Sequence, residues 1–276
     1  MKTKNVGTTK MAMTLSTIDK QPDLKAIKAF LDEWVPKINV PSFIERDPIQ
    51  FVHRYTNRED QEVVAILTAT ITWGNRAMIL NSATKMLKMM GDSPFDFIRD
   101  GAFHHLSKGN IHRTFFVKDL LYLCRGLQQC YQTHHSIEDY FVDSNSIWAG
   151  LTHFRKDLAV ANEGVYSKHV SNPESNSACK RLHLALRWLV RNDGVVDLGL
   201  WDRISPSALY IPLDVHVGRI ARSLGLLHRS QNDAKSVEHL THILRSFSPE
   251  DPIKYDFALF GIGESKNALP QFGFLQ

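Results

Sequence analysis

Apolar residues recur along most of this chain with the spacing of an α-helix. One segment, residues 62–72, carries Val64, Leu67, Thr68 and Ile71 at successive helical turns. Its remaining positions are also mostly apolar, which predicts a central helix that is buried on all sides. Similar periodicity predicts helices near residues 24–35, 79–90, 117–131, 136–142, 146–161, 182–191, 217–224, 237–247 and 251–263. No alternating strand pattern of useful length and no internal repeat is found, so the fold class is all-α.

Proline and glycine mark the ends of several predicted helices. Pro36 is expected to close the first helix, because proline cannot donate the backbone hydrogen bond that continues it. Gly225 is placed as a C-terminal cap, and Asp251-Pro252 forms an N-cap and first-turn pair. The composition of the polar stretch 171–177 predicts a loop, and residues 195–210 are expected to be irregular.

Length and composition predict how the helices are organised. The chain has 276 residues, of which 43% are hydrophobic, enough for a large core. We expect residues 1–20 to form a mobile tail and residues 21–276 to form one unit with two helical lobes that flank a cleft. The first lobe spans about 45–165 and the second about 175–247, with the terminal helices packed across both.

The location expected from sequence is the cytoplasm. No apolar run is long enough to cross a bilayer, and the polar N-terminal segment does not resemble a signal peptide. The three cysteines are an odd number without zinc-type spacing, which favours a reducing compartment and core positions. We expect a monomer without a membrane partner. The net charge of +4 permits binding to a polyanion but does not establish it.

Three segments in order resemble a known superfamily. Residues 62–75, followed by 81–87, are similar to an early core helix, the DNA-contacting loop after it and the next helix. The segment Ile211-Pro-Leu-Asp-Val-His-Val-Gly-Arg-Ile-Ala-Arg-Ser-Leu-Gly-Leu226 is similar to a motif that carries an essential aspartate, and 255–263 is similar to a late helix ending in glycine. The superfamily is that of the helix-hairpin-helix DNA glycosylases, and the chain also resembles an uncharacterised bacterial family associated with it.

This resemblance implies a base-excision enzyme that acts on double-stranded DNA without a cofactor, with Asp214 as the catalytic carboxylate. Two features of the superfamily are missing. No cysteine follows Cys179, so no iron–sulfur cluster is implied. The glycine-rich hairpin that normally binds a DNA phosphate is absent, since Gly194 and Gly199 lack its spacing.

The resemblance also implies a lysine nucleophile. Where most bifunctional members place it, this chain has Val196. Archaeal 8-oxoguanine glycosylases have a longer insert between lysine and aspartate, and Lys180, 34 residues before Asp214 at the head of a helix, resembles that arrangement. An uncharged Lys180 amine could attack C1′ and form a Schiff base. The plainer interpretation is that Lys180, His183, Arg187 and Arg191 form one solvated basic helix face.

Asp214 likewise has two interpretations. It stands at a helix start, where a carboxylate can simply cap the first backbone N–H groups. As a catalytic group, it would stabilise the positive charge that develops on the sugar as the base leaves.

Further residues are candidate DNA or base contacts. The turn that contains Trp73, Asn75 and Arg76 could enter a duplex from which a base has been removed, or could be a plain interhelical turn. The remaining candidates are Arg187, Trp188, Trp201, His216, Arg219 and Arg222. No carboxylate–histidine cluster has metal-ligand spacing, so no metal site is expected.

Three hypotheses therefore stand. The first is a glycosylase, with or without AP-lyase activity, that removes a damaged base, an oxidised purine being the first guess. The second is a nucleic-acid-binding protein without catalysis on the same scaffold. The third is a helical protein unrelated to DNA. If the first holds, Asp214 and Lys180 should converge in one cleft.

Overall fold

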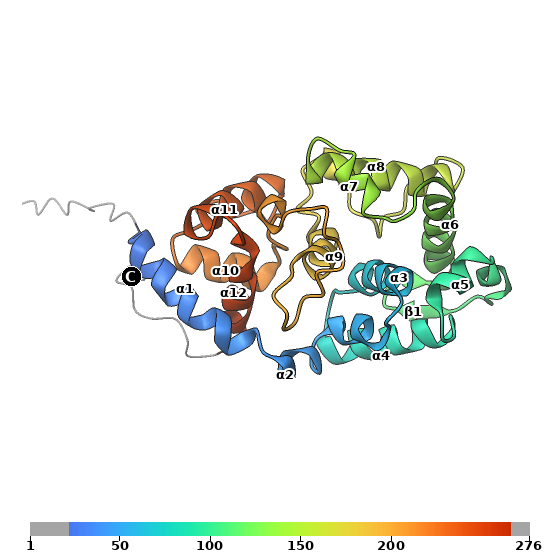
Figure 1. The fold of residues 1–276 in the computed structure, drawn as a ribbon, viewed down its shortest axis with the longest axis horizontal. Coiled ribbons are helices and arrows are strands. Elements are labelled where there is room, and N and C mark those ends of the chain that lie inside the picture. The colour runs from blue at the N-terminus through green and yellow to red at the C-terminus, as the bar shows by residue number, and fades with distance from the viewer. Residues whose placement is uncertain (1–21, 266–276) are drawn as a thin grey trace, which may run out of the picture.

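The computed structural model describes residues 22–265 of the protein and confirms the all-α fold (Figure 1). The α-helices are α1 (Leu24–Ile38), α2 (Pro41–Ile44), α3 (Arg58–Thr70), α4 (Arg76–Lys88), α5 (Pro94–Arg99), α6 (Val117–Thr133), α7 (Asp139–Val142), α8 (Ile147–Val160), α9 (Lys180–Val190), α10 (Val215–Ser223), α11 (Ala234–Phe247) and α12 (Tyr255–Glu264). Short 3-10 helices are η1 (Pro48–Arg54), η2 (Ala102–His105), η3 (Pro173–Ser175), η4 (Pro206–Ala208) and η5 (Pro252–Lys254). None of the helices in this part of the chain is long and apolar enough to cross a membrane.

Helix α3 is the buried central helix that the sequence predicts. Its N-cap, Asn57, accepts hydrogen bonds from the backbone N–H groups of Glu59 and Asp60. From Glu62 to its end the helix is buried on every side. It packs against η1, α5 and α9 and thereby connects the N-terminal part of the chain to α9, which begins at Lys180.

The remaining helices gather on either side of α3 and α9 (Figure 1). Helices α1, α10, α11 and α12 lie at one end, where α12 packs against both α1 and α10. Helices α4 to α8 lie at the other end, where α6 packs against α8. The division into lobes spanning 45–165 and 175–247 stays a prediction. The predicted tail, residues 1–20, lies outside the described residues.

One local prediction is wrong, and one short element was not predicted. Pro36 does not end the first helix, because α1 continues to Ile38 with Pro36 inside it. A proline so near the C-terminus removes one hydrogen bond of the last turns and leaves the preceding ladder intact. The sequence also showed no sign of the short antiparallel hairpin formed by β1 (Asn110–His112) and β2 (Phe115–Phe116), although it correctly indicated that no long strand is present in residues 22–265. Strands of three and two residues are too short to show an alternating pattern.

The irregular segment after α9 folds back over that helix. The N–H groups of Leu198 and Trp201 donate to the carbonyls of Trp188 and Leu189, each at 2.8 Å. These bonds satisfy carbonyls in the last turn of α9, which have no partner within the helix. They fix the path of the chain from α9 toward Asp214 at the start of α10.

Candidate active site

A cavity of about 800 Å³ opens between α9, α12 and the start of α10. Its wall also includes the turn between α3 and α4 and the segment just before η1. The polar and aromatic lining residues include Asp47, Thr72, Trp73, Arg76, Lys180, Arg181, Arg187, Asp214, His216, Asp256, Phe257, Phe260 and Glu264, and Gly74 also lines it. The volume falls in the range of pockets that bind small organic molecules.

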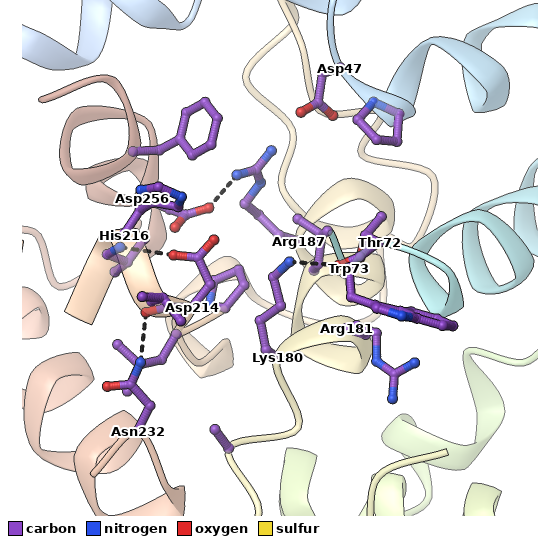
Figure 2. A pocket seen from close by; sticks show the side chains of 18 of the residues that line it. Asp47, Thr72, Trp73, Lys180, Arg181, Arg187, Asp214, His216, Asn232 and Asp256 are labelled. Atoms are coloured by element: carbon purple, nitrogen blue, oxygen red, sulfur yellow. Dashed lines mark hydrogen bonds and ion pairs between the residues drawn. The ribbon is translucent and has the colours of Figure 1, made fainter. Parts of the chain in front are cut away.

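Lys180 is the first residue of α9, and its side chain points into this pocket (Figure 2). Its Nζ donates a hydrogen bond of 3.2 Å to the carbonyl oxygen of Thr72. Burial lowers the pKa of the Lys180 amine, while the carboxylates of Asp214 and Asp256 oppose that change. The net effect favours the uncharged amine relative to a lysine in water, as a nucleophile requires.

Asp214 is the N-cap of α10. Its Oδ1 accepts a hydrogen bond of 2.8 Å from the N–H of Val217, and its carbonyl accepts one of 2.8 Å from Nδ2 of Asn232. The capping interpretation is therefore correct. The same carboxylate also lines the pocket that holds Lys180 (Figure 2). Capping holds the carboxylate in a fixed position beside the amine, so the structural and catalytic interpretations are compatible.

A buried ion-pair network forms the floor of the site. Arg187 pairs with Asp256 on α12 and with Asp197 in the segment after α9. Arg191 also pairs with Asp197, at 2.9 Å. Both arginines are at most 4% exposed, as is Asp197. The prediction that α9 has a solvated basic face is therefore wrong for Arg187 and Arg191. Carboxylates from distant segments neutralise these arginines and allow their burial.

His183, on the same helix, is buried without any acidic partner. It is 1% exposed, and neither of its ring nitrogens has a hydrogen-bond partner within residues 22–265. Burial lowers the pKa of the imidazole to about 3, so His183 is neutral near pH 7.

Asp256 and Asp47 add two carboxyl groups that were not among the predicted site residues. Burial raises the pKa of Asp256 to about 6, against the lowering effect of Arg187, and the nearby Asp214 carboxylate raises it further. Asp47 caps η1 by accepting a 3.0 Å hydrogen bond from the N–H of Ile49, and burial raises its pKa as well. Asp256 falls within segment 255–263, and the resemblance of that segment to the superfamily could have identified it as a site residue. No feature of the sequence pointed to Asp47.

Aromatic side chains form two walls of the pocket. Phe43 contacts Phe257 and Phe260 edge to face, with ring centroids 5.5 and 5.9 Å apart. On the other side, Trp73 stacks on His169 at 5.5 Å, and the guanidinium of Arg181 lies 5.0 Å from the Trp73 ring. Together with the charged floor, this gives the pocket flat apolar surfaces and a few polar groups.

The other predicted contact residues are divided between the pocket, its surroundings and the core. Arg76 lines the pocket and pairs with Glu264 at 2.6 Å, and His216 also lines it. Asn75 caps α4 and does not line the pocket. Neither Arg219 nor Arg222 lines the pocket: Arg219 donates to the carbonyl of Gly263, and Arg222 donates to Oδ1 of Asn232, which does line it.

Trp188 and Trp201 are not in the pocket. They are 0% and 1% exposed in the core, so neither can stack on a base without unfolding of its surroundings. The indole N–H of Trp201 donates to the buried Glu62 at 2.9 Å, which accounts for its position. Large aromatic residues bury the most apolar surface, so core positions are their usual place in a helical protein.

Metal binding finds no support among the described residues, since no group of three or more His, Cys, Asp or Glu side chains is placed to hold an ion. The cysteines Cys124, Cys130 and Cys179 are free and buried.

Comparison with known proteins identifies one family. Residues 47–265 match the family described as "Protein of unknown function (DUF2400)", and the match includes Asp47, Lys180, Asp214 and Asp256. No curated protein and no solved structure matches the chain. Because the match covers well over half of the sequence, the chain belongs to the DUF2400 family.

Proposed function

We propose that this protein is a DNA glycosylase that excises a damaged base and uses Lys180 as its nucleophile, with an associated AP-lyase activity. The observation that carries the proposal is the presence of Lys180 and Asp214, from two different helices, in one pocket. The resemblance of residues 211–226 to a glycosylase motif supports it, and so does the lowered pKa of the lysine.

The reaction begins with the uncharged amine of Lys180. Its lone pair forms a bond to C1′ while the glycosidic C–N bond breaks and its electron pair leaves with the base, which takes up a proton. Loss of a proton from the nitrogen and opening of the C1′–O4′ bond then give a Schiff base. Loss of the proton on C2′ from this imine then expels the 3′ phosphate as the C3′–O3′ bond breaks, which is the lyase step.

Asp214 acts by electrostatics in this scheme. As the base departs, positive charge develops on the sugar ring, and a fixed carboxylate stabilises that charge more in the transition state than in the ground state. The capping bond from Val217 holds the carboxylate in place before the substrate arrives, so little reorganisation is needed.

The pocket suits an extruded nucleoside. Its volume of about 800 Å³ admits a purine with its sugar. Phe257 and Phe260 offer apolar ring surfaces, and the carboxyl groups of Asp47 and Asp256 offer hydrogen-bonding atoms. An oxidised purine is the first substrate to test, on the basis of the archaeal 8-oxoguanine glycosylases that the lysine and aspartate spacing resembles.

The test is a panel of duplexes, each with one lesion, scored for base release and for strand nicking. Borohydride should trap a covalent complex with the wild-type protein, and Lys180→Gln should abolish the trapping because only an amine forms a reducible imine. Asp214→Asn should keep DNA affinity while losing most base release. Trapping that survives Lys180→Gln would assign the nucleophile to another amine, and base release unaffected by Asp214→Asn would refute the mechanism.

A second candidate is a DNA-binding protein without catalysis. The hydrogen bond between Asp214 and Val217 favours it, because a helix cap explains the aspartate without any reaction. Tight duplex binding without base release on any lesion of the panel would support this candidate. The absence of any duplex binding at low salt would instead favour a function unrelated to DNA.

A further inference from the structure

The hairpin β1–β2 places one arginine at the edge of the pocket. Arg113 lies between the two strands, and a Cβ atom at Gly74 would lie 2.7 Å from its Nη1 and 3.3 Å from its Cδ. The arginine side chain therefore lies directly over the backbone of Gly74. Gly74 itself lines the pocket and has a φ of +94°, a conformation that favours glycine.

The hairpin is fixed to the pocket wall by several contacts. Nε2 of His112 forms a hydrogen bond of 2.8 Å with the carbonyl of Trp73, and its Nδ1 forms one of 3.0 Å with Oγ of Ser82 on α4. Lys85, also on α4, donates to the carbonyl of Asn110. Because His112 precedes Arg113 directly, these bonds set the position of the arginine relative to Trp73.

The backbone of Arg113 is strained. Its φ of 49° is in the left-handed region, which residues other than glycine, asparagine and aspartate seldom occupy. Its carbonyl accepts a hydrogen bond of 2.7 Å from Nδ2 of Asn110, which holds the turn. Strain kept in place by neighbouring contacts is common where a side chain must be presented to a ligand.

Within residues 22–265 the guanidinium of Arg113 makes no ion pair and no hydrogen bond, and the residue is exposed. The arginines that line the pocket differ in this respect. Arg76 pairs with Glu264, Arg181 donates to the carbonyl of Thr70, and Arg187 pairs with Asp256. Arg113 thus keeps its full capacity for an external anion.

We infer that Arg113 binds a phosphate of the DNA strand whose nucleotide enters the pocket. This inference rests on the proposed function and deepens it, since the glycine-rich hairpin that usually binds phosphate has no counterpart in the sequence. The phosphates on either side of an extruded nucleotide must lie at the pocket edge, where Arg113 stands. A guanidinium presents paired N–H donors that match two phosphate oxygens.

The test measures affinity for a lesion duplex over a range of salt concentrations. Arg113→Gly removes the charge and suits the left-handed backbone, so the fold should be retained. Each phosphate contact contributes about 0.9 to the slope of log affinity against log salt, and Arg113→Gly should reduce the slope by about that amount. Arg113→Lys should keep the slope but lose several-fold in affinity. Lys25→Ala, which removes a charge from an exposed position outside the pocket lining, is the control and should change neither.

A second measurement locates the contact. Single methylphosphonate groups, which carry no charge, replace in turn each phosphate near the lesion. At one of the phosphates that flank the lesion, the substitution should weaken binding by the wild-type protein and should have little further effect on Arg113→Gly.

The inference is overturned if methylphosphonate at every position weakens duplex binding equally in the wild type and in Arg113→Gly, or if Arg113→Gly leaves the salt slope unchanged. Either result leaves the glycosylase proposal intact. Failure of the wild-type protein to bind duplex at low salt would instead refute both.

Discussion

The carboxyl group of Asp256 should make the stability of the protein depend on pH. It is 5% exposed on α12, and its pKa is raised from 3.8 to about 6 because burial disfavours the charged form. Well below pH 3.8 the carboxyl is protonated in both the folded and the unfolded chain. As the pH rises toward 6, the unfolded carboxyl ionises while the folded one resists, so the contribution of this group to the free energy of unfolding falls.

The size of the fall follows from the two pKa values. Each pH unit between them removes about 1.4 kcal/mol, which gives close to 3 kcal/mol for the whole interval. The substitution Asp256→Asn has nearly the same shape, keeps an oxygen that can accept from Arg187, and cannot ionise. Part of this fall has already occurred at pH 4, where the unfolded carboxyl is more than half ionised. Relative to the wild type, the free energy of unfolding of this variant should therefore rise by about 2.5 kcal/mol between pH 4 and pH 7.5.

Urea denaturation of both proteins at pH 4, 5.5 and 7.5 measures this difference directly. Asp202→Asn, which changes an exposed aspartate, is the matched control and should follow the wild type at every pH. Denaturation curves in which Asp256→Asn differs from the wild type by the same amount at all three pH values would show that Asp256 ionises in the folded protein as it does in water. Burial would then not be what governs the charge of this carboxyl.

Three further predictions concern the cap, the packing of α6 and the lysine. Asp214→Ala should lower the free energy of unfolding by about 1 kcal/mol in urea titrations, because the N–H of Val217 loses its acceptor, whereas Asp214→Asn should cost much less; equal losses would contradict the capping role. Gly126→Ala should cost about 1–3 kcal/mol in the same titrations, since its Cβ would lie 2.2 Å from Cδ2 and 3.1 Å from Cα of Leu158, and Gly109→Ala, whose Cβ would approach no atom more closely than 3.7 Å, should fold normally. The single-turnover rate of base release should rise with pH with a midpoint below 10.5, the ordinary pKa of lysine, because the uncharged form of Lys180 is the nucleophile; a rate that does not change between pH 6 and pH 10 would contradict this role.

Much of the fold followed from the sequence because helices are set by neighbouring residues. The apolar positions of residues 62–72 fix α3, and the side chain of Asp214 caps α10 from only three residues away. Such interactions involve a single turn of helix, so a linear pattern contains them. The hairpin at 110–116 could not be found in this way, because its short strands are stabilised by contacts with α4 and Trp73 rather than by a pattern of their own.

The candidate site was only partly visible in the sequence. Lys180 and Asp214 came from resemblance, and their presence in one pocket required the segment after α9 to fold back over that helix. The stacking roles expected of Trp188 and Trp201 found no support, since helical spacing does not distinguish an aromatic side chain at a pocket from one in the core.

The sequence by itself determined the all-α class, the positions of the main helices and the capping of α10, since these depend on residues within a few positions of each other. Only the tertiary structure decided which charges are buried and which face an external ligand. Arg187 is buried because Asp197 and Asp256 arrive from two separate segments to neutralise it. Arg113 stays free because no carboxylate in the described part of the chain comes within ion-pair distance. The cost of burying a charge depends on its partners in space, and a linear pattern does not contain them.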